Sequence, residues 1–237
     1  MRWDVSGWRR AVAAAILVAA GAAGALWLAG VQAKDDVRTP PQRATQLLKP
    51  GPLPELVLGR PDAPVTIVEY ADLTCPHCAS FHANVLPLLK ERYIDTGKAR
   101  LLFREFPLNT HSLIAFMSVR CVPQEHAFPL LAALFSHQDD WTQSRSTEEI
   151  ANKLFTYGQQ VGLTRAAFDA CVPATDQLTT DRQRQLFKDV AAIGEHAAKA
   201  FGVSSTPTFF VNGEKLGEPT IAEFDKAIGA ALKAKGL

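Results

Sequence analysis

The alternation of apolar and polar residues predicts short strands separated by helices. Four apolar runs have the length and content of strands: residues 55–58, 64–71, 100–106 and 208–211. From residue 77 to residue 93, and again from about residue 180 to Gly202, apolar side chains recur near every 3.6 residues, which predicts amphipathic helices. Pro87 falls inside the first of these helices, and we expect a kink there because proline removes a backbone hydrogen bond.

The stretch between the third and fourth predicted strands is helical throughout. Ser146-Thr147-Glu148-Glu149 is a capping box that opens a helix to about residue 161. After the last strand, Asn212-Gly213 is a hairpin signal, and a second capping box at Thr220 opens a final helix. The order is therefore ββαβ, a helical block, then αββα. The sequence predicts an α/β fold, in which helices cover both faces of a central sheet.

The N-terminal segment predicts export from the cytoplasm. Residues 11–30 contain no charge, and Arg2, Arg9 and Arg10 precede them. Positive charge before an apolar segment keeps the N-terminus in the cytoplasm and sends the remainder across the membrane. Residues 1–33 are thus either a signal peptide cleaved near Ala33 or a signal anchor, and both readings stay open. In either case we expect the domain in the periplasm or on the extracytoplasmic face of the inner membrane.

Composition supports one globular domain behind this segment. Residues 34–53 are polar and contain four prolines, which predicts a flexible tether, and residues 54–237 form the predicted domain. Of all residues, 47% are hydrophobic and 21% are charged, as in ordinary globular proteins. The net charge is only +1, which argues against nucleic-acid binding. We expect a monomer, and contact with the membrane only through residues 11–30 if they are retained.

Cys75-Pro76-His77-Cys78 carries most of the chemical information in the sequence. The two thiols follow a predicted buried strand and open a predicted helix. A thiol in the first helical turn faces unpaired backbone N–H groups and the positive end of the helix dipole, which favour the reactive thiolate. The spacing also allows a small disulfide ring. Cys75 and Cys78 are therefore predicted to be a dithiol/disulfide redox centre.

The interpretation of the two remaining cysteines depends on the expected export of the domain. Four cysteines in an oxidising compartment are expected to form disulfides, and Cys121 and Cys171 are the distant pair. A disulfide between them would stabilise the fold by about 4 kcal/mol in the chain-entropy model. Two free buried thiols are the alternative. A zinc site would need a second close cysteine pair, which the sequence lacks, so we expect no metal. No nucleotide or flavin motif is present, and we expect no cofactor.

The layout of strand, Cys-x-x-Cys, helix and a proline-led strand with an Asn-Gly hairpin resembles the thioredoxin fold. Residues 54–237 more narrowly resemble the DsbA-type thiol:disulfide oxidoreductases, with a helical domain inserted at about residues 108–190. The resemblance rests on the Pro76-His77 dipeptide, on Glu69 six residues before Cys75, on Thr206-Pro207 and on Pro87. It implies a thioredoxin fold with an inserted helical domain.

The resemblance also implies roles for these residues. Cys75 would be the attacked sulfur, and Cys78 would be the buried resolving thiol. Pro76 fits an early helical position, and His77 could donate a hydrogen bond or positive charge to the Cys75 thiolate. Glu69 would be buried near Cys78 and could accept its proton.

The proline loop is expected to bind substrate. A cis Pro207 would hold the backbone of Thr206 beside Cys75, where a substrate segment can pair like an added strand.

These roles predict an exported enzyme that introduces disulfides into thiol-containing exported proteins. The resemblance implies a quinone-linked membrane oxidase that re-oxidises it. A reductase or isomerase remains an alternative, because strongly oxidising relatives often carry an aliphatic residue where this chain has Thr206. A non-catalytic peptide-binding or chaperone module is the alternative from another class, and it predicts that Cys75 is dispensable.

Overall fold

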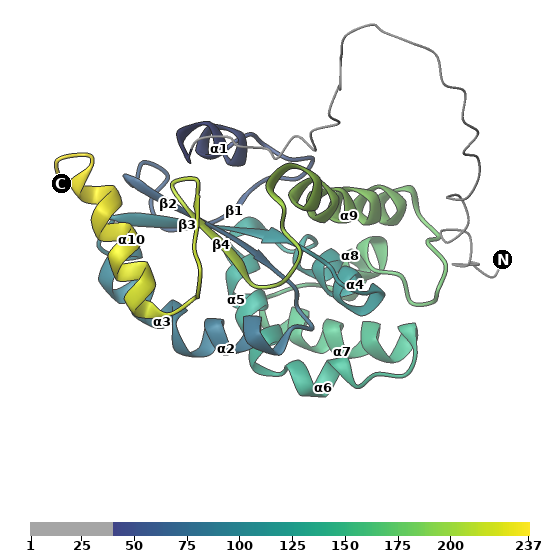
Figure 1. The fold of residues 1–237 in the computed structure, drawn as a ribbon. Helices are drawn as coiled ribbons and strands as arrows, with labels where there is room; N and C mark the ends of the chain where they lie inside the picture. The colour runs from purple at the N-terminus through teal and green to yellow at the C-terminus, as the bar shows by residue number, and fades with distance from the viewer. Residues whose placement is uncertain (1–39) are drawn as a thin grey trace, which may run out of the picture. The chain divides into compact units, whose positions relative to one another are not determined.

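A five-stranded mixed sheet organises the protein in a computed structural model that describes residues 40–237 (Figure 1). Its strands are β1 (Leu56–Leu58), β2 (Val65–Ala71), β3 (Ala99–Glu105), β4 (Thr208–Val211) and β5 (Glu214–Lys215). The spatial order is β1-β3-β2-β4-β5, and only β2 and β3 run parallel. This arrangement confirms the predicted α/β thioredoxin fold and places β2 at the centre.

The two faces of the sheet follow from the alternation of side chains along β2. Val68 and Tyr70 pack against α1 (Pro40–Leu47) and α9 (Asp181–Phe201) on one face. Val65 and Ile67 point to the other face, which α2 (Pro76–Asn84), α3 (Leu86–Leu89) and α10 (Ile221–Lys233) cover. Figure 1 shows the two helical layers on either side of the strands. Glu69 has the same parity as Ile67 and therefore points toward α2.

The predicted helix from residue 77 to residue 93 is divided into three pieces. The helix α2 ends at Asn84, α3 spans Leu86–Leu89, and a π-helical turn, η2, spans Lys90–Ile94. Pro87 lies in the first turn of α3, where a missing N–H costs little. The proline therefore marks the start of a new helix, and the break falls just before it.

The helical insertion shares one core cluster with Phe103 of the sheet and Cys78 of α2. It comprises α4 (Thr110–Val119), α5 (Gln124–Ser136), α6 (Gln138–Thr142), α7 (Thr147–Gln160) and α8 (Arg165–Cys171). Trp141 is fully buried. Ser146 is the N-cap of α7, as predicted, since its side chain accepts from the Glu149 N–H, but the capping box is only half formed because the Glu149 carboxylate accepts from the Arg145 N–H instead of that of Ser146. Helix α9 begins inside the predicted insertion but continues to Phe201, where it packs on the sheet. It ends at Gly202, whose φ of 64° suits glycine.

Part of the predicted tether is folded. Residues 40–47 form the helix α1, and Leu47 is buried against the sheet. The prediction of an extended tether is wrong for these residues. Proline is well tolerated in a first helical turn, and Leu47 at the end of the helix is buried in the core. The predicted signal peptide or anchor lies outside the described residues. Among residues 40–237, no helix has the length and apolar content that crossing a bilayer requires.

Candidate active site

The loop from Asp72 to Cys75 connects the central strand to α2. Asp72 is fully buried, and its Oδ1 accepts from the Thr74 backbone N–H at 2.6 Å, which closes a tight turn. Its Oδ2 accepts from the Leu108 N–H at 2.6 Å and so ties this loop to the one after β3. Cys75 is then the N-cap of α2, and Pro76 occupies the first turn, as predicted.

The Cys75 sulfur lies where a negative charge is stabilised. Its pKa is lowered from 9.0 to about 5, first by a hydrogen bond from the Cys78 thiol, and also by the Thr206 side chain and the backbone N–H groups of Cys78 and His77, although burial opposes the shift. The Thr206 hydroxyl has no other hydrogen-bond partner in the structure and is available to the thiolate. The side chain of His77 is exposed. The His77 backbone N–H contributes to the lowered pKa of Cys75, and a role for its imidazole stays a prediction.

The second thiol lies in the opposite environment. Cys78 is fully buried, one turn into α2. Its pKa is raised, first by burial, then by its hydrogen bond to Cys75 and by the nearby Glu69 carboxylate. Both cysteines are free thiols in the structure. At neutral pH the pair therefore consists of a thiolate at Cys75 and a thiol at Cys78.

A buried carboxylate and a histidine lie beneath this pair. Glu69 is fully buried, and its Oε1 lies 3.0 Å from Nε2 of His82. Its Oε2 has no hydrogen-bond partner in the described part of the chain. His82 is four residues after Cys78, on the same face of α2, and its ring stacks on Phe135 with centroids 4.2 Å apart. The side chain of His82 is 6% exposed, so it lies between Glu69 and the surface.

The proline loop completes the surroundings of Cys75. The Thr206–Pro207 peptide bond is cis, and the Cys75 sulfur lies 3.4 Å from the Thr206 carbonyl oxygen, to which it donates only when it is protonated. The structure thus brings together the Cys75–Cys78 pair, Glu69 and the Thr206–Pro207 loop.

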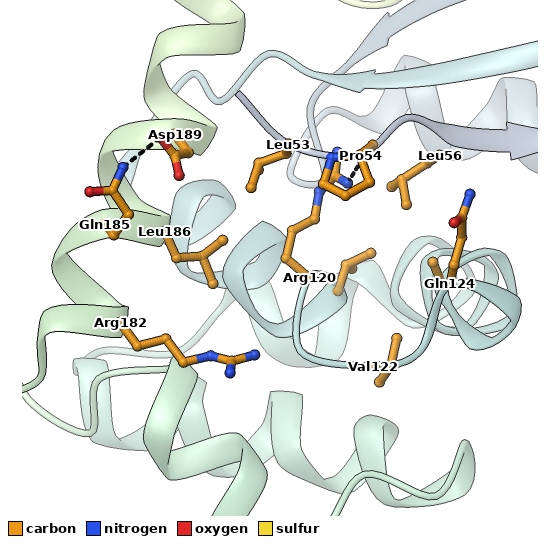
Figure 2. Close-up of a pocket in the computed structure, with 12 residues that line it drawn as sticks. Leu53, Pro54, Leu56, Arg120, Val122, Gln124, Arg182, Gln185, Leu186 and Asp189 are labelled. Carbon is orange, nitrogen blue, oxygen red and sulfur yellow. Dashed lines mark hydrogen bonds between the residues drawn. The ribbon is translucent and has the colours of Figure 1, made fainter. Parts of the chain in front are cut away.

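The other cysteine pair lies elsewhere. Cys121 and Cys171 form a disulfide with their Cα atoms 6.1 Å apart, and it joins the end of α4 to the end of α8. Nε of Arg182 lies 3.1 Å from the Cys171 sulfur. Arg182 also lines a cavity of about 440 Å³ between α9 and the α4–α5 region, shown in Figure 2. None of the predicted redox or substrate-binding residues lines that cavity.

Comparisons with known proteins agree with this geometry. The family model for thioredoxin matches residues 53–230. A Rickettsia felis protein named as a protein-disulfide oxidoreductase is 30% identical over 208 residues, which cover 84% of this chain and 70% of that protein. The crystal structure of alpha-DsbA1 from Wolbachia pipientis superposes with a TM-score of 0.67 at 31% identity, over 81% of this chain and 99% of that one.

The chain belongs to the DsbA-like branch of the thioredoxin family. A similarly named relative from Rickettsia bellii is 32% identical over 180 residues, and the match covers 76% of this chain but 65% of that protein. The structure of BdbD from Bacillus subtilis has the same fold, with a TM-score of 0.62 at 20% identity over 76% of this chain and 93% of that one.

Several residues of this DsbA-like site were not predicted from the sequence. His82 is one of them, because no pattern in the sequence indicates a partner for it. Its spacing of four from Cys78 does place both residues on the buried face of one helix. Asp72 and Gln138 were not identified. Gln138 lies 63 residues from Cys75, and no local pattern links the two. Within residues 40–237, no group of three or more His, Cys, Asp or Glu side chains is arranged to hold a metal ion.

Proposed function

We propose that this DsbA-like protein is an exported dithiol oxidase that introduces disulfide bonds into other exported proteins. The observation that carries the proposal is the contrast within the redox pair: the pKa of Cys75 is lowered to about 5, and that of Cys78 is raised. A stabilised thiolate favours the reduced form of the enzyme. Its disulfide is then a strong oxidant.

The exchange proceeds in two steps. A substrate thiolate attacks the Cys75 sulfur of the Cys75–Cys78 disulfide, so that a mixed disulfide forms and Cys78 leaves. The second thiolate of the substrate then attacks the sulfur of the first substrate cysteine in the mixed disulfide. A disulfide forms within the substrate, and Cys75 leaves as a thiolate. Two electrons pass from the substrate dithiol to the enzyme. The low pKa of Cys75 makes it a good leaving group in the second step.

Glu69 and His82 handle the proton of the first step. Cys78 is buried and leaves as a thiolate, which must be protonated because its pKa is raised. Glu69 is the nearby acid–base group, and it cannot exchange protons with water directly because it is fully buried. His82, hydrogen-bonded to Glu69 and closer to the surface, connects it to solvent.

The substrates and partner follow from the same site. A substrate segment pairs with the backbone beside Thr206, which recognises an extended chain more than its side chains. We propose cysteine-containing exported proteins as substrates, in the periplasm or at the outer face of the inner membrane. Continued turnover requires an electron acceptor, for which we propose a quinone-linked membrane oxidase.

The reduction potential of the Cys75–Cys78 pair tests the direction of the reaction. The domain, with Cys121–Cys171 intact, is equilibrated with glutathione buffers and the redox states are separated by alkylation. We expect a potential well above the glutathione range, where each ~30 mV corresponds to ~1.4 kcal/mol for the two-electron couple.

The rate of mixed-disulfide formation tests the role of Glu69. In the same preparation, Glu69→Gln should slow this step about tenfold or more at neutral pH.

A reductase is the second candidate. It rests on the family comparison alone, in which strongly oxidising relatives often have an aliphatic residue where this chain has Thr206. The Thr206 hydroxyl itself helps to lower the pKa of Cys75 and so supports the oxidase. A potential near or below that of thioredoxin would contradict the oxidase proposal and support this one.

A further inference from the structure

The backbone of the redox loop is held by side chains of the inserted helices. Leu73 is fully buried, and its N–H donates to Oγ of Ser112 in α4 at 3.2 Å. Its carbonyl accepts from Nε2 of Gln138 in α6 at 2.8 Å. The backbone N–H and the carbonyl of this buried residue are therefore both hydrogen-bonded to the insertion and not to the sheet or to α2.

Gln138 makes a second contact, to the redox residue itself. The same Nε2 donates to the Cys75 carbonyl at 3.1 Å, and that carbonyl also accepts the first helical N–H of α2, from Ala79 at 3.2 Å. Gln138 is 8% exposed and lies at the first position of α6. One amide group thus links the insertion to the residue that begins the catalytic helix.

We propose that Gln138, supported by Ser112, is a positioning residue that holds Cys75 in its N-cap conformation. This inference rests on the redox role proposed above for Cys75. According to this proposal, the helical insertion contributes directly to the chemistry, because its side chains fix the loop that places the Cys75 sulfur at the N-terminus of α2.

The physical reason is the direction of the peptide groups around the sulfur. Cys75 has φ −80° and ψ 118°, an extended conformation that turns its carbonyl toward α6 and leaves the following N–H groups facing its side chain. The N–H groups of His77 and Cys78 are among those that stabilise the thiolate. Without Gln138, the buried Leu73 carbonyl loses the hydrogen bond from its side-chain amide, and the loop must move to satisfy that carbonyl. The sulfur then moves relative to those N–H groups.

The chain contains a matched control for Gln138. Gln183 is also a buried glutamine of the helical region, 2% exposed, and its Nε2 also donates to two backbone carbonyls, of Asp169 at 2.9 Å and of Val172 at 3.2 Å. It does not touch the redox loop. Gln138→Met and Gln183→Met both keep the side-chain length and remove the donor. Gln183→Met also removes the Oε1 that accepts from the Thr179 and Thr180 N–H groups in the capping box of α9, so it is the more disruptive change. The pair therefore separates loss of buried hydrogen bonds from loss of positioning.

A second matched pair lies within α4. Ser112→Ala removes the hydroxyl that holds the Leu73 N–H. Ser118→Ala removes another fully buried hydroxyl of the same helix, which donates only to the Ala115 carbonyl at 2.6 Å. Both changes are small enough to preserve folding. If Gln138→Met does not fold, this pair still tests the proposal.

The experiment is a titration of the reduced domain from pH 3 to 9 that follows thiolate absorbance at 240 nm, with circular dichroism as a check of folding. The unmodified protein should titrate near pH 5. Gln138→Met should raise the midpoint by about one unit, a tenfold lower ratio of thiolate to thiol at a given pH, and lower the equilibrium constant for oxidising glutathione about tenfold. Ser112→Ala should give a smaller shift in the same direction, roughly threefold. Gln183→Met and Ser118→Ala should lower the thermal midpoint without moving the titration.

The outcomes distinguish this inference from the proposed function. An unmodified protein that titrates near pH 9 would contradict the proposed role of Cys75 itself. A normal titration that neither Gln138→Met nor Ser112→Ala shifts would overturn only the positioning role. Equal shifts in Gln183→Met and Gln138→Met would also overturn it, because the effect would then be one of general stability.

Discussion

The two cysteine pairs of this protein lie at opposite ends of helices. Cys75 is the N-cap of α2, and the free N–H groups of that helix face its sulfur. Cys171 is the last residue of α8, and Cys121 follows the end of α4, with its sulfur 3.0 Å from the Met117 carbonyl. Helix N-termini favour a thiolate and C-termini disfavour it. The same side chain is thus reactive in one place and structural in the other.

Access separates Cys75 from Cys171, but not from Cys121, which is only partly buried. Cys171 does have a cation beside its sulfur, since Arg182 lies 3.1 Å away. Cys171 is only 1% exposed, however, whereas Cys75 is 9% exposed and lies beside the proline loop. Charge stabilisation alone therefore does not make a cysteine reactive, because an attacking thiolate must also reach the sulfur.

Replacing Cys75 should have the largest effect. Cys75→Ser removes the attacked sulfur, so oxidation of a reduced two-cysteine peptide should fall at least about a thousandfold, to the uncatalysed rate. The assay follows loss of peptide thiols, and the Cys121→Ala/Cys171→Ala double variant is the control that should keep most of the activity. An unmodified protein that oxidises the peptide no faster than Cys75→Ser, while both bind it equally well, would instead favour the non-catalytic binding module.

Removing the other pair should change stability. The Cys121→Ala/Cys171→Ala protein should lose about 2–5 kcal/mol of unfolding free energy, because the unfolded chain is no longer constrained and two helices lose their cross-link. Urea unfolding of the two proteins measures this difference. A double variant as stable as the parent but inactive would reverse the roles assigned to the two pairs.

The stability of the reduced protein should depend on pH, with a sign set by Cys75. Its pKa is lowered from 9.0 to about 5 on folding, so the folded state binds fewer protons than the unfolded state between these values. The contribution of Cys75 to the free energy of unfolding is fully present above about pH 9 and is lost as pH falls through about 5. Unfolding of the reduced protein at pH 5 and pH 8 should show this loss on acidification.

The serine variant is the control for that measurement. Reduced Cys75→Ser has no such thiolate, so the difference in stability between pH 8 and pH 5 should be smaller than in the parent. An identical pH dependence in the two proteins would mean that Cys75 is not the group responsible.

Local pattern and family resemblance predicted the sheet and the redox motif. The apolar run at 65–71, the adjacent Cys-x-x-Cys and the Asn-Gly hairpin each report on neighbouring residues, so one sequence is enough to locate them. The helix α1 was missed because its prolines suggest an extended chain, whereas a proline in the first turn and one buried leucine suffice for a short helix.

The contacts around the redox pair were harder to predict, because they join distant segments. His82 meets Glu69 across 13 residues, and this depends on how α2 packs on β2. Gln138 reaches the loop across more than 60 residues, through the packing of the whole insertion. Periodicity predicts which face of an element is buried, but it does not say which polar side chain of another element will complete it.

The wide separation of Cys121 and Cys171 also bears on how a new chain matures. Four thiols can be joined in three ways, and chain closure favours the two cysteines separated by only two residues. The bond between Cys121 and Cys171 spans 50 positions and requires their Cα atoms to come within 6.1 Å, which happens when α4 and α8 have packed. We therefore expect this cross-link to form late in maturation, when it would fix an insertion that has already folded.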